Sequence, residues 1–261
     1  MGTAIMLLTV GGLLFTWDIF LKTTSALIRP AARAFLDARV SHMAARLMRM
    51  ARVYGKLHVE LDPRLGEGLP NPCLICSNHQ SIADIAILLA AFKSHSIRFV
   101  AKQELTRGFP AVSEVLRIQK HALIDRRGGY RATARALAGL GRKAASGLSP
   151  IVFPEGTRSR DGRVRTFQTG GIRTILDQTS LPIVGVAIDG GHHFVGMSNL
   201  FRGLKGLTYR VALVGVFTPG PGKRAVQHAI ADLQAAVERQ LDAWHQLDEG
   251  SQPYQEPQRA C

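Results

Sequence analysis

The sequence contains few cysteines, few aromatic residues and comparatively few acidic residues. Three cysteines in 261 residues are too few for a disulfide scaffold, and aromatic residues make up only 7% of the chain. Cys73 and Cys76 lie inside an apolar run, so we interpret them as core residues. The sequence also lacks a GxxxxGK[ST] phosphate loop, zinc-finger spacing and any alternation of basic with aromatic residues. Because these features are absent, nucleic acid is an unfavoured partner, and we expect the protein not to bind it.

The remaining composition is that of a basic globular protein. Hydrophobic residues make up 46% and charged residues 20% of the chain, and 33 Lys and Arg face 19 Asp and Glu, a net charge of +14. The excess lies in two blocks, residues 1–60 with eight basic and three acidic residues, and residues 98–173 with sixteen and five. This charge predicts an anionic partner, either a phosphorylated metabolite or an acidic membrane surface.

The N-terminal part of the chain has a pattern of its own. The apolar run over residues 4–17 ends at Asp18 and is shorter than the roughly 20 residues that a membrane span needs. Over residues 19–57, apolar positions recur at helical spacing between basic residues, and Pro30 is expected to start or kink a helix. An apolar stub before a basic amphipathic stretch favours a segment that lies in the membrane interface. The alternative is a helical pair packed on the protein's own core.

Short apolar and β-branched runs alternate with helical patterns along the rest of the chain. The runs occupy residues 58–61, 73–77, 97–101, 121–125, 150–153, 183–188 and 209–217. Helical patterns occupy residues 82–93, 129–146, 168–179 and 226–244. This alternation predicts an α/β fold with a mixed, largely parallel sheet flanked by helices. We therefore expect a membrane-anchoring helical segment over residues 1–57, an α/β domain over residues 58–248 and a polar tail over residues 249–261.

The first motif with chemical potential is a histidine followed by a carboxylate. His79 comes directly after a strand run, and Asp84 lies five residues further, just inside a predicted helix. A neighbouring carboxylate fixes the tautomer of a histidine and stabilises its imidazolium, as a general base requires. The alternative is structural, with Ser81 and Asp84 forming a helix-capping arrangement and His79 a satisfied loop residue.

A second motif, Phe-Pro-Glu-Gly-Thr-Arg-Ser-Arg over residues 153–160, also ends a strand run. Gly156 lets the backbone approach a ligand closely, Arg158 can grip a phosphate with its planar fork of donors, and Thr157 adds a hydroxyl. Glu155 beside these anion-binding groups suggests a hydrogen bond to a hydroxyl or the orientation of an arginine. An exposed turn is the alternative interpretation.

Two further basic residues follow strand runs. Arg126 is a candidate phosphate contact in the sequence Ile-Asp-Arg-Arg, and Lys102 closes the run Arg-Phe-Val-Ala-Lys. The alternative for Arg126 is a surface ion pair with Asp125, which would contribute little to stability.

Together these motifs resemble the glycerolipid acyltransferases typified by 1-acyl-sn-glycerol-3-phosphate (lysophosphatidic acid) acyltransferase. Asn78, His79 and Asp84 match the Asn-His-x-x-x-x-Asp block of that family. The Phe-Pro-Glu-Gly-Thr-Arg-Ser block, the Ile-Asp-Arg element and a late proline follow, at residues 153–159, 124–126 and 182. Two positions depart from the pattern: Ser113 replaces a glycine and Gly185 replaces a second proline.

The resemblance implies transfer of a fatty acyl group from acyl-CoA or acyl carrier protein to a lysophospholipid hydroxyl. The favoured acceptor is 1-acyl-sn-glycerol-3-phosphate, which would give phosphatidic acid. It implies His79 as the base and Asp84 as its orienting partner. The implied substrate-binding residues are Lys102, Arg126, Glu155, Gly156, Thr157 and Arg158.

The same resemblance implies that the reaction needs no metal and no cofactor beyond the thioester co-substrate. It implies a membrane-associated protein on an anionic lipid surface, at the cytoplasmic face of the inner or plasma membrane. Two alternatives remain. One is an acyltransferase for another lysolipid, such as a lyso-aminolipid, and the other is a non-catalytic anionic-lipid-binding protein of the same fold.

Overall fold

A mixed sheet forms the centre of the molecule. The computed structural model describes residues 2–66, 68–125, 128–194 and 206–250. The strands follow the order β1-β7-β6-β2-β5-β3-β4, and each neighbouring pair is parallel except β6 with β7. Their bounds are β1 (His58–Leu61), β2 (Leu74–Ser77), β3 (Ile97–Lys102), β4 (Ala122–Ile124), β5 (Ser149–Val152), β6 (Ile183–Asp189) and β7 (Thr208–Phe217). Each strand overlaps one of the expected apolar runs, and the mixed, largely parallel sheet is confirmed.

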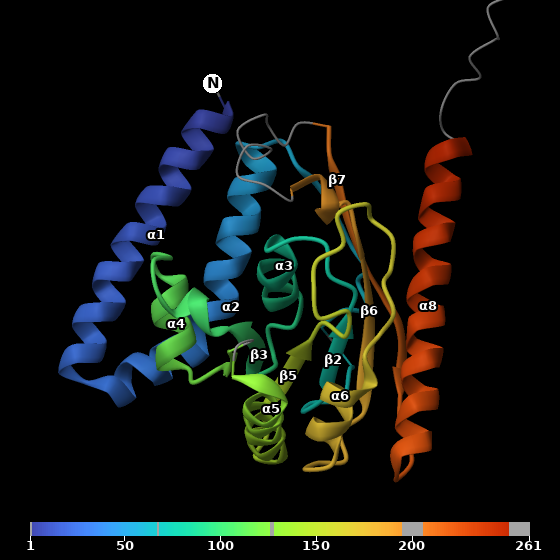
Figure 1. Cartoon of the computed structure of the whole chain (residues 1–261). Helices are drawn as coiled ribbons and strands as arrows, with labels where there is room; N and C mark the ends of the chain where they lie inside the picture. The colour runs from blue at the N-terminus through green and yellow to red at the C-terminus, as the bar shows by residue number, and fades with distance from the viewer. Residues whose placement is uncertain (1, 67, 126–127, 195–205, 251–261) are drawn as a thin grey trace, which may run out of the picture.

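Helices cover both faces of this sheet (Figure 1). Their bounds are α1 (Gly2–Leu27), α2 (Arg29–Val53), α3 (Ala83–Ala91), α4 (Val112–Ile118), α5 (Gly129–Ala145), α6 (Thr169–Leu176) and α8 (Lys223–Gly250), with short 3₁₀ turns η1 (Gln103–Thr106) and η2 (Gly191–Phe194). Side chains alternate between the faces along each strand. Val184 and Val186 pack with α2 and α3, whereas Ile183 and Ala187 pack with α5, α6 and α8. The sheet therefore lies between two apolar cores.

The first two helices form a hairpin on one side of the sheet. Pro30 lies in the first turn of α2, as expected of a helix start. Val40 and Ala44 of α2 join the core formed with α3 and the sheet, so the hairpin packs on the rest of the protein. Within the described ranges, we find no helix whose length and hydropathy would let it cross a bilayer.

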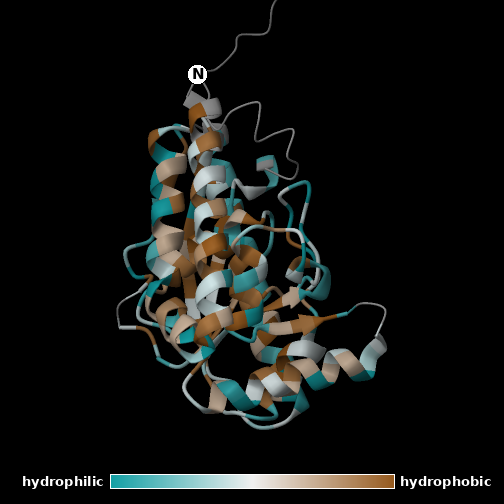
Figure 2. Ribbon diagram, turned by 90° about the vertical axis from the view of Figure 1, so that its left-hand side faces the viewer, coloured by the Kyte–Doolittle hydropathy of each residue, from teal (hydrophilic) through white to brown (hydrophobic). Residues whose placement is uncertain are grey.

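The outer helix of the hairpin keeps an apolar surface. Figure 1 shows that α1 lies away from the sheet, and Figure 2 shows hydrophobic segments along this helix. The exposed apolar side chains of α1 include Leu8, Phe15, Ile19, Phe20 and Leu27. Packing of the hairpin on the core and contact of α1 with lipid are thus compatible, and the interfacial segment stays a prediction.

Two polar contacts attach the hairpin to the rest of the protein. Asp18 of α1 is 7% exposed and accepts a 3.0 Å hydrogen bond from the backbone N–H of Ala111, at the start of α4. Arg98 of β3 is 1% exposed and donates a 2.7 Å hydrogen bond to Asp37 of α2. Buried charges of this kind are stable only when paired, so both contacts fix the hairpin on the domain.

Local structure explains the two departures from the family pattern. A side chain at Gly185 would overlap Leu233 of α8, because that helix lies close against β6 at this point. The hydroxyl of Ser113 accepts a 3.1 Å hydrogen bond from the N–H of Phe109 and donates a 3.0 Å bond to the carbonyl of Leu105. Both residues therefore serve local packing or turn closure.

Candidate active site

His79 lies just beyond β2, at the carboxyl edge of the parallel strands. Its Nδ1 is 2.6 Å from Oδ2 of Asp84. The ring stacks on Phe153, with 3.9 Å between ring centroids and an interplanar angle of 13°. The side chain is 16% exposed, so one part of a sterically fixed ring reaches the surface. The structure thus brings together the two residues that the first motif singled out.

Asp84 is fully buried and accepts hydrogen bonds from several directions. Its Oδ2 also accepts the backbone N–H groups of Gln80, at 2.7 Å, and Ser81, at 2.9 Å. Its Oδ1 accepts the hydroxyl of Tyr209. The residue at the N-cap of α3 is Ile82, which makes no side-chain capping bond, so the expected cap at Ser81 is displaced by one residue. The carboxylate of Asp84 nevertheless holds both the turn before the helix and His79.

This arrangement assigns the tautomer of the imidazole. A carboxylate that accepts bonds from backbone amides and a phenol is a hydrogen-bond acceptor, so Nδ1 of His79 is the donor in their contact. The Nε2 lone pair is then free to take a proton, and Asp84 stabilises the imidazolium that results. The pair has the geometry of an oriented general base.

The loop after β5 wraps around His79, because β5 is the neighbour of β2 in the sheet. Oε1 of Glu155 accepts the backbone N–H of His79 at 2.8 Å, and Oε2 accepts the N–H of Arg165 at 3.1 Å. The N–H of Ser159 donates a 2.7 Å bond to the carbonyl of His79. Burial raises the pKa of Glu155 to about 7, although both amide donors oppose this shift. Glu155 is therefore held within the scaffold that positions His79.

The basic candidates lie along the same edge of the sheet. Thr157 and Arg158 are exposed on the loop after β5, and Gly156 adopts a φ of +68°, which favours glycine. Lys102 is exposed at the end of β3, two strands from β2. Arg126, which follows β4, lies outside the described residues. The parallel strands thus direct Lys102, Arg158 and His79 to one edge of the molecule.

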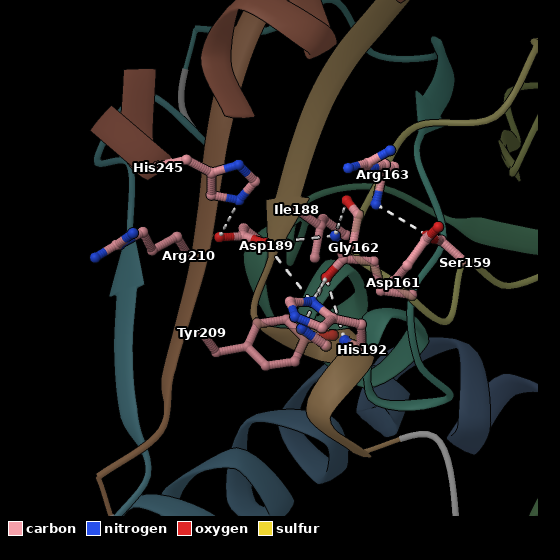
Figure 3. A network of polar contacts seen from close by, with 12 residues as sticks. Ser159, Asp161, Gly162, Arg163, Ile188, Asp189, His192, Tyr209, Arg210 and His245 are labelled. Carbon is pink, nitrogen blue, oxygen red and sulfur yellow. Dashed lines mark hydrogen bonds and ion pairs between the residues drawn. The ribbon is translucent and has the colours of Figure 1, made fainter. Parts of the chain in front are cut away.

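Sequence reasoning did not identify two buried residues that contact this site. Gln80 is fully buried, and its Oε1 accepts the backbone N–H groups of Gly191, at 2.9 Å, and His192, at 3.3 Å. Figure 3 shows His192 beside Asp189, and Tyr209 on β7. Tyr209 lies 125 residues beyond Asp84, so no local spacing could link the two. Among the residues that the structure describes, no group of three or more His, Cys, Asp or Glu side chains could hold a metal ion.

Known proteins share sequence patterns with this chain. The family model described as Acyltransferase matches residues 58–189. A 1-acyl-sn-glycerol-3-phosphate acyltransferase of Cocos nucifera is 34% identical over 119 residues, which are 45% of this chain and 37% of that protein. A lyso-ornithine lipid O-acyltransferase of Rhizobium meliloti is 30% identical over 148 residues, 56% of this chain and 46% of that protein. The chain thus spans less than half the length of these two curated relatives.

One solved structure has the same fold over nearly the whole chain. It is the crystal structure of the 1-acyl-sn-glycerophosphate (LPA) acyltransferase PlsC from Thermotoga maritima. The comparison covers 97% of both chains with a TM-score of 0.71 and 19% sequence identity. At that identity the likeness establishes the fold alone.

Proposed function

The chain belongs to the acyltransferase family, and from this premise we propose that it transfers a fatty acyl group from a thioester to the hydroxyl of a lysophospholipid. The donor is acyl-CoA or acyl carrier protein, and the favoured acceptor is 1-acyl-sn-glycerol-3-phosphate. The observation that carries the proposal is the 2.6 Å contact between His79 Nδ1 and buried Asp84, which leaves the outer ring nitrogen available as a base.

In the proposed reaction, Nε2 of His79 removes the proton of the acceptor hydroxyl while the oxygen attacks the thioester carbonyl carbon. The resulting tetrahedral intermediate breaks its C–S bond, and the leaving thiolate takes the proton back from the imidazolium. Asp84 holds the ring and stabilises its positive charge between these two steps. No covalent acyl-enzyme is needed, since the acceptor alcohol attacks directly.

The exposed basic groups at the same edge have a role in holding the acceptor. Arg158 and Arg126 bind the phosphate of the acceptor, with Thr157 and Lys102 as further donors. Gly156 and Glu155 shape this site, Glu155 by fixing the backbone of His79. Fixing the acceptor hydroxyl beside Nε2 lowers the entropic part of the barrier.

A membrane surface is the proposed location of the reaction. The exposed apolar residues of α1 and the excess of basic residues over positions 1–60 support binding to an anionic lipid surface at the cytoplasmic face. In this arrangement the hairpin rests on lipid, and the folded domain carries the active site next to an acceptor held in the membrane.

A second acceptor class has support from one relative. The similarity to the lyso-ornithine lipid O-acyltransferase of Rhizobium meliloti favours a lyso-aminolipid as the alternative acceptor. The chemistry at His79 is the same for both acceptors. The two acceptors differ in whether they carry a phosphate that Arg158 can bind. A reaction that requires the phosphate of the acceptor therefore favours lysophosphatidic acid over a lyso-aminolipid.

The decisive experiment measures thiol release from acyl-CoA in the presence of lysophosphatidic acid or lyso-ornithine lipid, with acyl carrier protein thioesters in parallel. We expect release with lysophosphatidic acid, and loss of it in a folded His79→Ala variant. His228→Ala, an exposed histidine on α8, is the matched control and should retain activity. Substantial turnover by folded His79→Ala would reject the base assignment. Lipid binding without any acceptor-dependent thiol release would favour the non-catalytic alternative.

A further inference from the structure

Tyr209 contacts the proposed catalytic pair from outside the region that the family model matches. It lies on β7, whereas the match ends at residue 189. We propose that Tyr209 is a positioning residue for acyl transfer, whose hydroxyl holds Asp84 in the orientation that serves His79. This inference rests on the proposed function, because it assigns a role within that reaction.

The hydrogen bonds on Asp84 are divided between its two oxygens. Oδ2 faces His79 and the amides of Gln80 and Ser81, whereas Oδ1 receives the hydroxyl of Tyr209. With donors on both sides, the carboxylate cannot turn about its terminal bond without breaking a contact. Tyr209 is 1% exposed, so water has little access to replace it at Oδ1.

The backbone of η2 closes this contact. A Cβ atom on Gly191 would lie 2.9 Å from the hydroxyl oxygen of Tyr209 and 3.1 Å from Oδ1 of Asp84. Gly191 is in turn fixed by its 2.9 Å hydrogen bond to Gln80. The tyrosine, the aspartate and the glycine backbone are therefore packed so closely that no side chain fits at position 191.

The electrostatic surroundings keep Tyr209 a donor. Burial and the adjacent carboxylate raise the pKa of Tyr209 well above its usual range, so its hydroxyl stays protonated at any working pH. The other titratable groups that face the pair are His79, Glu155 on the loop after β5, and Asp189 at the end of β6. His192 of η2 approaches the same turn through Gln80.

Loss of the hydroxyl has a directional consequence. Without the Tyr209 donor, the negative charge of Asp84 is less stabilised, and the His79–Asp84 pair holds its proton more strongly. Because His79 must be deprotonated to act as a base, the acid limb of the pH–rate profile moves to higher pH. A merely structural tyrosine would lower the amount of folded enzyme without moving that limb.

The test compares Tyr209→Phe with Tyr130→Phe, which removes a hydroxyl that is exposed on α5. For Tyr209→Phe we expect kcat to fall about ten-fold or more, the usual effect of losing a hydrogen bond to a buried charge, with the KM of both substrates within about two-fold. The acid limb should move to higher pH. Tyr130→Phe should match the wild type. An unchanged kcat and an unmoved acid limb in folded Tyr209→Phe would overturn the proposal.

Two further measurements test the role of Tyr209 if Tyr209→Phe folds poorly or if the protein lacks the proposed activity. Fluorotyrosine at position 209 keeps the shape of the ring and strengthens the donor, so the acid limb should move to lower pH with each added fluorine. The absence of an ordered shift would reject the role of Tyr209.

Histidine-selective NMR follows the titration of His79 without turnover, and its midpoint should rise in Tyr209→Phe. If wild-type protein transfers no acyl group, the proposed function fails, whereas an unmoved His79 midpoint refutes the Tyr209 contact by itself.

Discussion

Glu155 and His79 are joined by a 2.8 Å hydrogen bond from the backbone N–H of the histidine to the glutamate carboxylate. The contact connects the loop after β5 to the turn after β2, so the two sequence motifs form one scaffold. Glu155 is only 7% exposed, and burial raises the pKa of its carboxylate to about 7. Glu155 therefore changes its charge near neutral pH within the scaffold that holds the proposed base.

The raised pKa of Glu155 predicts a pH-dependent stability. Native Glu155 binds its proton more tightly than the unfolded chain does, for which the pKa is 4.5. Its contribution to the free energy of unfolding is thus fully present below pH 4.5 and is lost as the pH rises through about 7. Glu155→Gln does not titrate, so between pH 4.5 and 8 the variant should gain up to about 3 kcal/mol relative to the wild type.

Urea unfolding of both proteins across that pH range measures the difference. Glu238→Gln, on the surface of α8, controls for removal of a carboxylate and should parallel the wild type. If the stabilities of Glu155→Gln and the wild type follow the same pH dependence, then Glu155 has an ordinary pKa and the assigned effect of burial is wrong.

Arg158 should act on the acceptor and not on the thioester. Its guanidinium is exposed at the carboxyl edge of the sheet, next in sequence to Ser159, which contacts the backbone of His79. We expect Arg158→Ala to raise the KM for lysophosphatidic acid about ten-fold or more, since a charge-assisted contact is lost, and to leave the KM for acyl-CoA nearly unchanged.

Steady-state kinetics with each substrate varied in turn provide the measurement. Arg239→Ala, an exposed arginine of α8, is the control for loss of one positive charge. Equal increases of both KM values in Arg158→Ala would count against the phosphate role. An increase with lysophosphatidic acid but none with lyso-ornithine lipid would assign the contact to the phosphate itself.

Local patterns were sufficient to predict the strands but not how distant segments meet. The runs at residues 73–77 and 150–153 stand out because both are apolar and end in polar motifs. Their adjacency in the sheet follows from strand order, which no local spacing encodes. Hence the sequence indicated the pairing of His79 with Asp84, five residues apart, but not the contact of His79 with Glu155, 76 residues away.

The sequence did not indicate the partners of the buried polar residues. In the sequence, Arg98 is one of many basic residues in a charged block. In the structure it is 1% exposed and donates a hydrogen bond to Asp37 of α2. The sequence pattern around Tyr209 predicts a strand. The alternation of residues along a strand predicts which side chains are buried, but not which group accepts the hydrogen bond of a buried hydroxyl. In both cases the partner comes from a distant element, so only the assembled fold reveals the role.

The exposed face of α1 should bind lipid. Leu8, Phe15 and Ile19 lie on one side of the helix and are 78%, 59% and 51% exposed. Replacing all three with serine removes apolar side chains worth roughly 1.5–3 kcal/mol each when fully buried, so partitioning onto vesicles should fall at least about 100-fold. Deleting residues 1–57 is a poorer test, because Val40 and Ala44 belong to the core.

Flotation with vesicles containing phosphatidylglycerol measures this partitioning. A variant with serine at Leu61 and Val216, exposed apolar residues of β1 and β7, controls for general loss of surface hydrophobicity. Equal flotation of the α1 variant and the wild type would exclude this face as the lipid contact. A selective loss with unchanged circular dichroism would place the interface on α1.

The ion pair between Arg98 and Asp37 should stabilise the attachment of the hairpin. Arg98 donates to Asp37 at 2.7 Å and to the backbone carbonyls of Gln119 and Ile97 at 2.8 and 2.7 Å. Burial lowers the pKa of Arg98 and the adjacent carboxylate opposes that shift, yet the guanidinium remains charged. Asp37→Ala would leave this charge without its counter-ion and should cost about 2–4 kcal/mol of the free energy of unfolding.

Asp37→Asn keeps an acceptor for Arg98 but removes the negative charge. Its free energy of unfolding should therefore lie between that of the wild type and that of Asp37→Ala. Asp232→Ala, on the exposed face of α8, should change the free energy of unfolding by less than about 0.5 kcal/mol. Urea unfolding at constant pH ranks the three variants. If Asp37→Ala is no less stable than Asp232→Ala, the contact does not hold α2 on the sheet. In that case the attachment depends on the apolar packing of Val40 and Ala44.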